Sequence, residues 1–222
     1  MTATVRPLAV FGGTFNPVHL GHLRSAVELV ECFSLDELRF MPCALPPHRE
    51  APGVDPETRA QLLELAIAGE PGLVCDRREL ARPGPSYTID SLLSLREELG
   101  RARPLLLVMG SDALAGLPRW HRWRELLTLC HILALARPDG ELPAAGEAAA
   151  LLARHRVDAP ALRERPAGGI HLTTLRPLPI SATEIRGLLQ SGRSVRYLVP
   201  EPVHAYLQRH GLYRRERDDC QQ

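Results

Sequence analysis

At residues 8–22 the chain reads LAVFGGTFNPVHLGH. The apolar run Leu8–Phe11 predicts a buried strand, the two glycines after it predict a sharp turn, and a helix is expected to start near Val18. A strand, a glycine turn and a helix in this order leave backbone N–H groups unpaired at the helix N-terminus, where the helix dipole favours anions. This stretch therefore predicts a site for nucleotide phosphate groups. It matches neither GxGxxG nor the Walker A motif, because the Walker lysine and its spacing are absent.

Strands and helices continue to alternate along the rest of the chain. Further buried strands are expected at Leu38–Met41, Leu105–Met109, Ile132–Ala136 and Ile170–Leu175, and segments with helical spacing lie between most of them. Alternation of this kind is typical of a parallel sheet covered by helices. We therefore expect an α/β fold with a Rossmann-like, doubly wound, mostly parallel sheet and helices on both faces.

Capping residues mark where several helices begin and end. A Ser or Asp side chain before a helix, a proline in its first turn and a glycine after its last turn are the usual signals. They predict helices that follow Asp55, run from about Thr88 to Gly100, run from the capping box of Ser181 to Gly192, and run from about Glu201 to His210.

Two segments are expected to lie outside this regular pattern. The stretch Pro138–Gly169 is rich in Ala, Pro and Gly and has a helical patch near Ala148–His155, which predicts a peripheral excursion and not a separate domain. Residues 214–222, RRERDDCQQ, are too polar and charged to bury a surface. We predict one nucleotidyltransferase domain over residues 1–213 and a polar, disordered tail over 214–222.

Composition narrows the range of partners. The chain has 222 residues, of which 45% are hydrophobic and 24% charged, and this suits a globular protein with a substantial core. Lys and Arg number 27 against 26 Asp and Glu, so no charge excess indicates nucleic acid or a membrane surface. Five scattered cysteines without a CxxC pair fit a reducing cytoplasm. We expect a cytoplasmic protein with small-molecule partners, and the composition leaves a homo-oligomer open.

The two histidines of the first motif are the candidate ligand-binding side chains. His19 and His22 can face the same side of one helical turn and share a ligand, and Gly21 between them leaves bare backbone on which a flat base could lie. Two other interpretations are open. The rings could be half-buried core side chains, or they could bind zinc, although a third ligand and the glutamate of an HExxH motif are missing.

The motif resembles the HxGH nucleotidyltransferase superfamily, whose members join a nucleotide to a phosphate or carboxylate acceptor and release pyrophosphate. Three further segments are similar to one member, the bacterial nicotinate-nucleotide adenylyltransferases. They are LPPHR at Leu45–Arg49, PSYT at Pro85–Thr88 and ISATEIR at Ile180–Arg186. The similarity also takes in GSDAL at Gly110–Leu114, LPRW at Leu117–Trp120 and the closing stretch up to Tyr213, in the expected order.

The resemblance implies an enzyme that joins the AMP moiety of ATP to nicotinate mononucleotide, giving deamido-NAD and pyrophosphate in NAD biosynthesis. The residues implied as catalytic are His19, His22 and Arg186. Those implied or expected to bind ATP are Gly12, Gly13, Thr14, Phe15, Gly21, Gly110, Arg137, Ile180, Ser181 and Thr183. Those implied to bind nicotinate mononucleotide are Asn16, His48, Arg49, Tyr87, Thr88, Asp112 and Trp120. We expect Mg²⁺ to be bound mainly through the ATP phosphates and water, with no ligand from protein side chains.

The chain departs from the family at two places. Asn16 stands where the family often has Asp, and Cys43 and Ala44 stand where it often has Asn. Asn16 keeps the side-chain shape and a carbonyl acceptor but lacks the negative charge.

Several alternatives remain for the motifs and for the function. Ser181 and Glu184 could simply cap a helix, and Tyr87, Trp120 and Trp123 could be core aromatics. The functional alternatives are a transferase acting on nicotinamide mononucleotide or phosphopantetheine, a catalytically silent nucleotide sensor, and a metal-binding protein using the two histidines.

Overall fold

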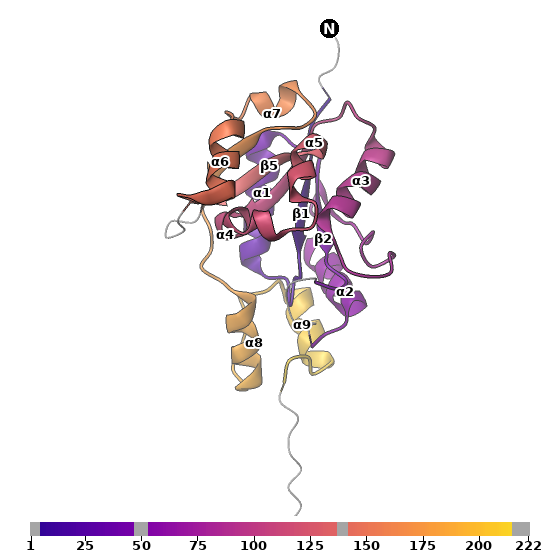
Figure 1. Cartoon of the computed structure of the whole chain (residues 1–222). Helices are drawn as coiled ribbons and strands as arrows, with labels where there is room; N and C mark the ends of the chain where they lie inside the picture. Colours follow the sequence, from indigo (N-terminus) through magenta and orange to yellow (C-terminus); the bar gives the residue numbers. More distant parts are fainter. Residues whose placement is uncertain (1–4, 47–52, 137–141, 215–222) are drawn as a thin grey trace, which may run out of the picture.

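The computed structural model describes residues 5–46, 53–136 and 142–214 (Figure 1). Over these ranges six parallel strands form one sheet in the order β3-β2-β1-β4-β5-β6. The strands are β1 (Leu8–Gly13), β2 (Glu37–Pro42), β3 (Leu73–Cys75), β4 (Leu105–Gly110), β5 (His131–Ala136) and β6 (Ile170–Thr174). The strand order reverses between β1 and β4. Open α/β sheets bind ligands at such a switch point, beyond the carboxyl ends of the strands.

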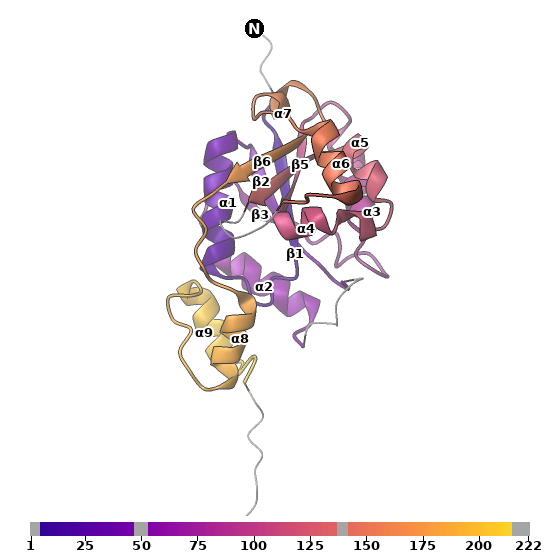
Figure 2. The same ribbon diagram turned by 60° about the vertical axis from the view of Figure 1, so that its left-hand side comes forward.

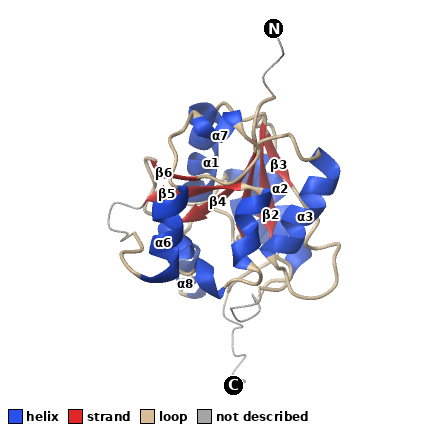
Figure 3. Cartoon of the chain, turned by 45° about the horizontal axis from the view of Figure 1, so that its top comes forward, coloured by secondary structure: helices blue, strands red, loops and turns tan. Residues whose placement is uncertain are grey.

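Helices cover both faces of the sheet, which confirms the expected Rossmann-like, doubly wound fold (Figure 3). The helical elements are α1 (Leu20–Phe33), α2 (Pro56–Ile67), α3 (Thr88–Leu99), α4 (Ser111–Ala115), η1 (Leu117–Arg119), η2 (Trp123–Glu125), α5 (Leu126–Leu129), α6 (Gly146–His155), α7 (Ala161–Glu164), α8 (Ala182–Gln190) and α9 (Glu201–Arg209). None of the helices in the described ranges is long and apolar enough to cross a membrane.

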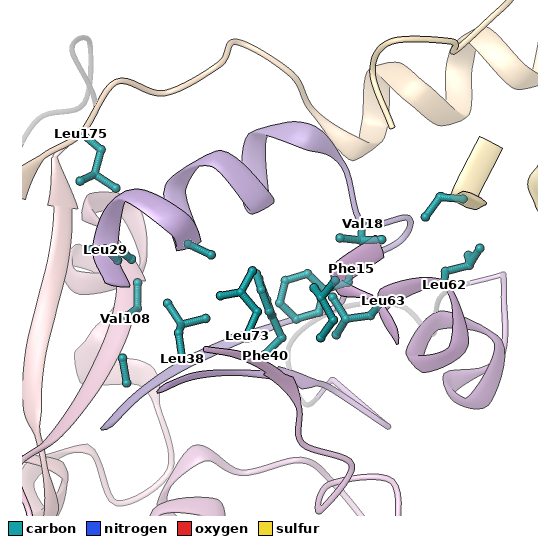
Figure 4. Packing of buried hydrophobic residues seen from close by; sticks show 14 of the residues in the cluster. Phe15, Val18, Leu29, Leu38, Phe40, Leu62, Leu63, Leu73, Val108 and Leu175 are labelled. Carbon is teal, nitrogen blue, oxygen red and sulfur yellow. The ribbon is translucent and has the colours of Figure 1, made fainter. Parts of the chain in front are cut away.

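Two apolar clusters fill the space between the sheet and its helices. Successive residues of β1 point to opposite faces, so Ala9 belongs to the cluster under α1 and α2 and Val10 to the cluster under α3 and α5. Figure 4 shows the first cluster, in which Leu29 of α1 lies over Leu38 of β2 and Phe15 extends the packing toward α2. Apolar strands buried on both faces are the usual pattern of a parallel sheet.

The sequence pattern predicts five of these strands, and all five are present with ends shifted by one or two residues. It does not predict β3, because three residues are too few to show a period. The helix expected near Val18 begins at Leu20 instead, with His19 as its N-cap. Asp55 caps α2 by accepting a hydrogen bond from the Thr58 amide at 2.9 Å, as expected.

The excursion after β5 packs against both faces of the sheet. Leu152 of α6 joins the second cluster, and Leu162 of α7 joins the first. Both α8 and α9 lie beyond the carboxyl ends of the strands, at the end of the molecule where the β1–α1 loop lies (Figures 1 and 2). A single domain over residues 1–213 stays a prediction. The tail expected at 214–222 lies outside the described residues except for Arg214.

Candidate active site

The glycine pair of the first motif lies inside β1. Gly12 pairs with Met41 and Gly13 with Pro42 of β2, so the sharp turn expected at the glycines is wrong and the chain turns after them. A Cβ atom at Gly12 would meet no atom within 4 Å, whereas one at Gly13 would lie 3.0 Å from the ring of Phe15. Gly12 thus leaves open space at the end of the strand, and Gly13 makes room for an aromatic side chain.

Phe15 is the centre of the turn that follows. Its φ of 45° lies in the left-handed region, which is uncommon for a bulky residue. Its ring is 2% exposed and packs edge-on against Phe40 at 5.4 Å and His22 at 5.1 Å between ring centroids. Because the ring is buried in the core, only the backbone of Phe15 is placed to contact a nucleotide.

The N-terminus of α1 has fewer unpaired amides than the sequence suggests. The Leu20 amide donates to the Leu198 carbonyl at 3.0 Å, and the amides of His22 and Leu23 donate to the His19 carbonyl at 3.0 and 3.3 Å. The prediction that phosphates bind these helix amides is therefore wrong for three of them. Phosphate binding at this end of α1 stays a prediction.

His19 and His22 do face the same side of the turn. Their rings are stacked, with centroids 3.7 Å apart and planes 27° from parallel. The Nδ1 atoms of both rings are buried and have no hydrogen-bond partner among the described residues. Leaving such an atom unpaired costs about 1–3 kcal/mol, so this pair is a place where the fold gives up stability.

The environment of the pair keeps both rings neutral. Burial lowers the pKa of His19 to about 4. Burial, together with a smaller effect of the neighbouring His19, lowers the pKa of His22 to about 3. At neutral pH each imidazole thus carries one ring N–H and no charge, which suits a donor for an incoming anion.

Gly21 has a role beyond the one expected. A Cβ atom at this position would lie 3.0 Å from Nδ1 of His19 and 3.3 Å from the Leu178 carbonyl oxygen. A side chain at this position would therefore crowd the His19 ring, and the interpretation that a flat base lies on the bare backbone stays a prediction. The glycine makes room for the histidine stack.

The ISATEIR segment meets this loop from the other side. Ser181 caps α8 by accepting a hydrogen bond from the Glu184 amide at 3.1 Å, so the capping interpretation is confirmed for its hydroxyl. Arg186 donates to the Asn16 carbonyl oxygen at 2.7 Å and to the Thr183 hydroxyl at 3.2 Å. Arg186 therefore holds α8 against the β1–α1 loop, which lies 170 residues away in sequence.

The PSYT segment lies against the first residues of LPPHR. The Ser86 hydroxyl accepts hydrogen bonds from the amides of Ala44 and Leu45 at 3.1 and 3.3 Å. The ring of Tyr87 contacts that of His121 at 4.4 Å between centroids. The segment after η1 therefore lies next to the PSYT segment. Thr88 begins α3 directly after Tyr87.

The other residues implied on the acceptor side are only partly described. Trp120 is half-buried against the second cluster. Asp112 folds back over Gly110, where a Cβ atom would lie 2.5 Å from a carboxylate oxygen. Trp123 is a core aromatic, as its alternative interpretation predicts. Three implied residues, His48, Arg49 and Arg137, lie outside the described residues.

Comparisons with known proteins show the family of the chain. The family model described as cytidylyltransferase-like matches residues 10–188. A protein of Pseudomonas entomophila (strain L48) named "Probable nicotinate-nucleotide adenylyltransferase" is 52% identical over 95% of this chain and 96% of its own length. A protein of the same name from Pseudomonas syringae pv. tomato (strain ATCC BAA-871 / DC3000) is 48% identical over 99% of each chain. The chain belongs to the nicotinate-nucleotide adenylyltransferase family.

Solved structures share the fold of this adenylyltransferase at low sequence identity. The Plasmodium falciparum nicotinic acid mononucleotide adenylyltransferase complexed with NaAD superposes with a TM-score of 0.68 at 14% identity, covering 94% of this chain and 97% of that one. The same protein complexed with APC superposes with a TM-score of 0.66 over the same shares of the two chains. The fold is thus shared although only 14% of the residues are identical.

Two residues that contact the loops of the candidate site are not found by sequence reasoning. Arg59 of α2 is fully buried and donates to carbonyls of the loops after β1 and β2. Tyr213 donates a short hydrogen bond to Oδ1 of Asn16. This side-chain oxygen would also be present in the Asp that the family often has at this position. A signal existed for Arg59, since it stands at a buried position of a helix beside Ala60, Leu62 and Leu63. For Tyr213 the sequence offers none.

A Ser181→Ala change in the adenylyltransferase separates capping from ATP binding. We expect the free energy of unfolding to fall by about 1 kcal/mol, because the hydroxyl caps α8. We also expect a higher KM for ATP, since the resemblance implies that this exposed residue binds ATP. Urea unfolding and steady-state kinetics measure the two effects. An unchanged KM with reduced stability would mean that Ser181 is a helix cap only.

The buried histidines should make the adenylyltransferase acid-sensitive. The pKa of His19 is about 4 in the folded protein against 6.5 for an ordinary exposed histidine, so below pH 6.5 the unfolded state binds more protons. Stability should therefore fall as the pH drops from about 6.5 toward 4. Between pH 7 and 5, we expect His19→Asn to lose about 2 kcal/mol less than the wild type. Urea unfolding at each pH measures this, and equal losses would contradict the prediction.

Proposed function

We propose that this enzyme transfers the AMP moiety of ATP to nicotinate mononucleotide, giving deamido-NAD and pyrophosphate in NAD biosynthesis. The observation that carries the proposal is the stacked pair His19 and His22, whose Nδ1 atoms are buried without partners among the described residues, at the carboxyl end of β1. The names of relatives that are about half identical over nearly the whole chain support the same reaction.

In the proposed reaction, a phosphate oxygen of nicotinate mononucleotide attacks the α-phosphorus of ATP. The bond from the α-phosphorus to the bridging oxygen breaks, and pyrophosphate leaves with the electron pair. The attacking phosphate is already ionised at neutral pH, so the step needs no strong general base. The protein has to align two polyanions and stabilise the charge that moves onto the leaving group.

His19 and His22 are suited to this task because they are neutral in the free protein and carry ring N–H groups. We assign them to the α- and β-phosphates, with Arg186 as a fixed cation beside them. An anion bound against the rings would raise their pKa values, which would strengthen the hydrogen bonds as charge develops. The further residues that we assign to ATP are Gly12, Gly13, Thr14, the backbone of Phe15, Gly21, Gly110, Arg137, Ile180, Ser181 and Thr183.

We place the acceptor on the other side of the switch point. Tyr87 and Trp120 are half-buried aromatics that can border a pyridine ring, and the Thr88 amide can reach its carboxylate. The remaining residues assigned to nicotinate mononucleotide are Asn16, His48, Arg49 and Asp112.

The family suggests that a divalent metal takes part. Among the described residues no three His, Cys, Asp or Glu side chains gather as a metal site. We propose that Mg²⁺ comes with the ATP phosphates and water, without ligands from protein side chains. We further propose that the enzyme works in the cytoplasm on these small partners, and not on nucleic acid or a membrane. The balance of 27 basic against 26 acidic residues supports this.

The decisive experiment is an acceptor panel. The enzyme is incubated with ATP and Mg²⁺ and with nicotinate mononucleotide, nicotinamide mononucleotide or phosphopantetheine in turn, and pyrophosphate release is measured. We expect the highest kcat/KM with nicotinate mononucleotide. A higher value with another acceptor would replace the proposed substrate. Tight ATP binding without pyrophosphate from any acceptor would indicate a nucleotide sensor.

A further inference from the structure

We propose that Arg59 is a positioning residue that fixes the ATP-side loop and the acceptor-side loop of the site to each other. The ATP-side loop is the turn at 14–18, and the acceptor-side loop is the segment at 43–45. The assignment of the two loops to the two substrates rests on the proposed function. The contacts of Arg59 do not depend on it.

The guanidinium of Arg59 joins the two loops directly. It donates to the Thr14 carbonyl at 2.6 Å and to the Cys43 carbonyl at 2.6 Å, with a longer contact of 3.4 Å to the Ala44 carbonyl. Its Nε donates to the Val54 carbonyl at 3.2 Å, which anchors the side chain to the start of its own helix. A single rigid, planar group thus sets the distance between the two loops.

The acceptor-side loop is held from its opposite edge as well. The Ser86 hydroxyl accepts hydrogen bonds from the amides of Ala44 and Leu45. The Cys43 amide donates to the Gly13 carbonyl at 2.9 Å. The carbonyls of Cys43 and Ala44 therefore point to Arg59, whereas the Leu45 carbonyl accepts from the Ser86 amide at 3.0 Å. Without Arg59, the link from this loop to Thr14 is lost and the one to Gly13 is kept.

Burying the charged guanidinium of Arg59 costs free energy, but its position allows the charge to act on the Thr14–Phe15 peptide group. Arg59 is 0% exposed, and all its guanidinium hydrogen bonds to described residues are accepted by backbone carbonyls. Burial lowers its pKa from the usual value, which shows that the surroundings disfavour the charge. A charged donor on the Thr14 carbonyl polarises the peptide group that follows, so the Phe15 amide becomes a stronger donor for phosphate.

Arg96 provides a matched control. It is a partly buried arginine on a helix, and burial also lowers its pKa. It too donates to backbone carbonyls, those of Leu129 at 2.7 Å, Arg103 at 2.7 Å and Pro166 at 2.9 Å. Arg103 precedes β4 and Leu129 precedes β5, and the Pro166 carbonyl accepts from the Leu105 amide at the start of β4. All three carbonyls lie at the opposite end of the sheet from the site. Losing Arg96 tests what a partly buried arginine bonded to backbone carbonyls contributes to stability away from the site.

The experiment compares Arg59→Gln, Arg59→Lys and Arg96→Gln. We expect Arg59→Gln to raise the KM for ATP and the KM for nicotinate mononucleotide together, each roughly tenfold, because a charged hydrogen bond to each loop is lost. Arg59→Lys keeps the charge but cannot hold both loops, so both KM values should still rise. Arg96→Gln should reduce stability and leave both KM values unchanged.

Hydrogen–deuterium exchange provides a readout that needs no turnover. Exchange at the Cys43, Ala44 and Leu45 amides and at the 14–18 loop should rise together in both Arg59 variants, and not in Arg96→Gln. Arg59→Lys with wild-type KM values and exchange would overturn the proposal, as would Arg59→Gln with reduced stability alone. Wild-type enzyme that is inactive on nicotinate mononucleotide would refute the proposed function, while the exchange comparison would still decide the role of Arg59.

Discussion

His22→Ala should lower kcat about 10²–10³-fold and leave the free energy of unfolding within about 1 kcal/mol of the wild type. The loss of activity follows if the ring N–H bonds strengthen as charge moves onto the leaving pyrophosphate. The small change in stability follows because the variant loses ring packing against Phe15 but also removes a buried Nδ1 that has no partner among the described residues. Few core substitutions lower kcat strongly while leaving the free energy of unfolding nearly unchanged. We expect both effects when the removed side chain serves function at the expense of stability.

Steady-state kinetics and urea unfolding of the same preparation measure both quantities. A fall in kcat and in kcat/KM by the same factor would place the lost interaction in the transition state. The control is His171→Ala, since His171 lies on β6 with its Nδ1 bonded to the Val157 carbonyl at 2.9 Å, far from the site. Near-normal kcat in His22→Ala would refute the assignment of this ring to the phosphates.

Arg186→Lys should lower kcat/KM for ATP on the order of 10²-fold, although the charge is kept. The guanidinium reaches the Asn16 carbonyl with one nitrogen and the Thr183 hydroxyl with another, and so fixes α8 beside the β1–α1 loop. The lysine ammonium has its three N–H donors on one nitrogen and lacks the planar fork that spans these two acceptors. Both the position of α8 and the cation at the phosphates should therefore be disturbed.

The control for this change is Arg193→Lys, at an exposed residue just beyond α8. Initial rates at varied ATP, with nicotinate mononucleotide saturating, give the effect, and thermal unfolding reports whether α8 stays docked. If Arg186→Lys keeps its kcat/KM while Arg186→Gln loses it, charge alone is what the site requires. If both keep it, Arg186 is a structural link only.

Elements with local signals are the ones that the sequence predicts well. The apolar runs Leu8–Phe11 and Leu105–Met109 indicate two strands of the sheet, and the Asp55 and Ser181 caps indicate two helix starts. Each of these signals extends over a few residues, and burial on both faces makes the runs apolar whatever lies around them. The three-residue strand β3 escapes prediction for the same reason, since its neighbours in the sheet define it and its own pattern does not.

The details of the site depend on contacts across the chain. The sequence places Gly21 between two histidines, but only the folded loop shows that the His19 ring takes the space of a Cβ atom there. It likewise suggests open amides at the start of α1, whereas the Leu198 carbonyl, far along the chain, occupies the Leu20 amide. No pattern within a few residues of Gly21 or Leu20 carries this information.

By itself, the sequence determined the α/β fold, the motif at the end of β1 and the family, because these depend on periodicity and on residue types in a fixed order. The tertiary structure alone decided that two histidine rings are buried, neutral at neutral pH and unpartnered at Nδ1 among the described residues. It also decided that Arg59 links two loops and that Tyr213 bonds Asn16. Burial and such long-range hydrogen bonds arise only when segments distant in sequence are brought together, so no local stretch encodes them.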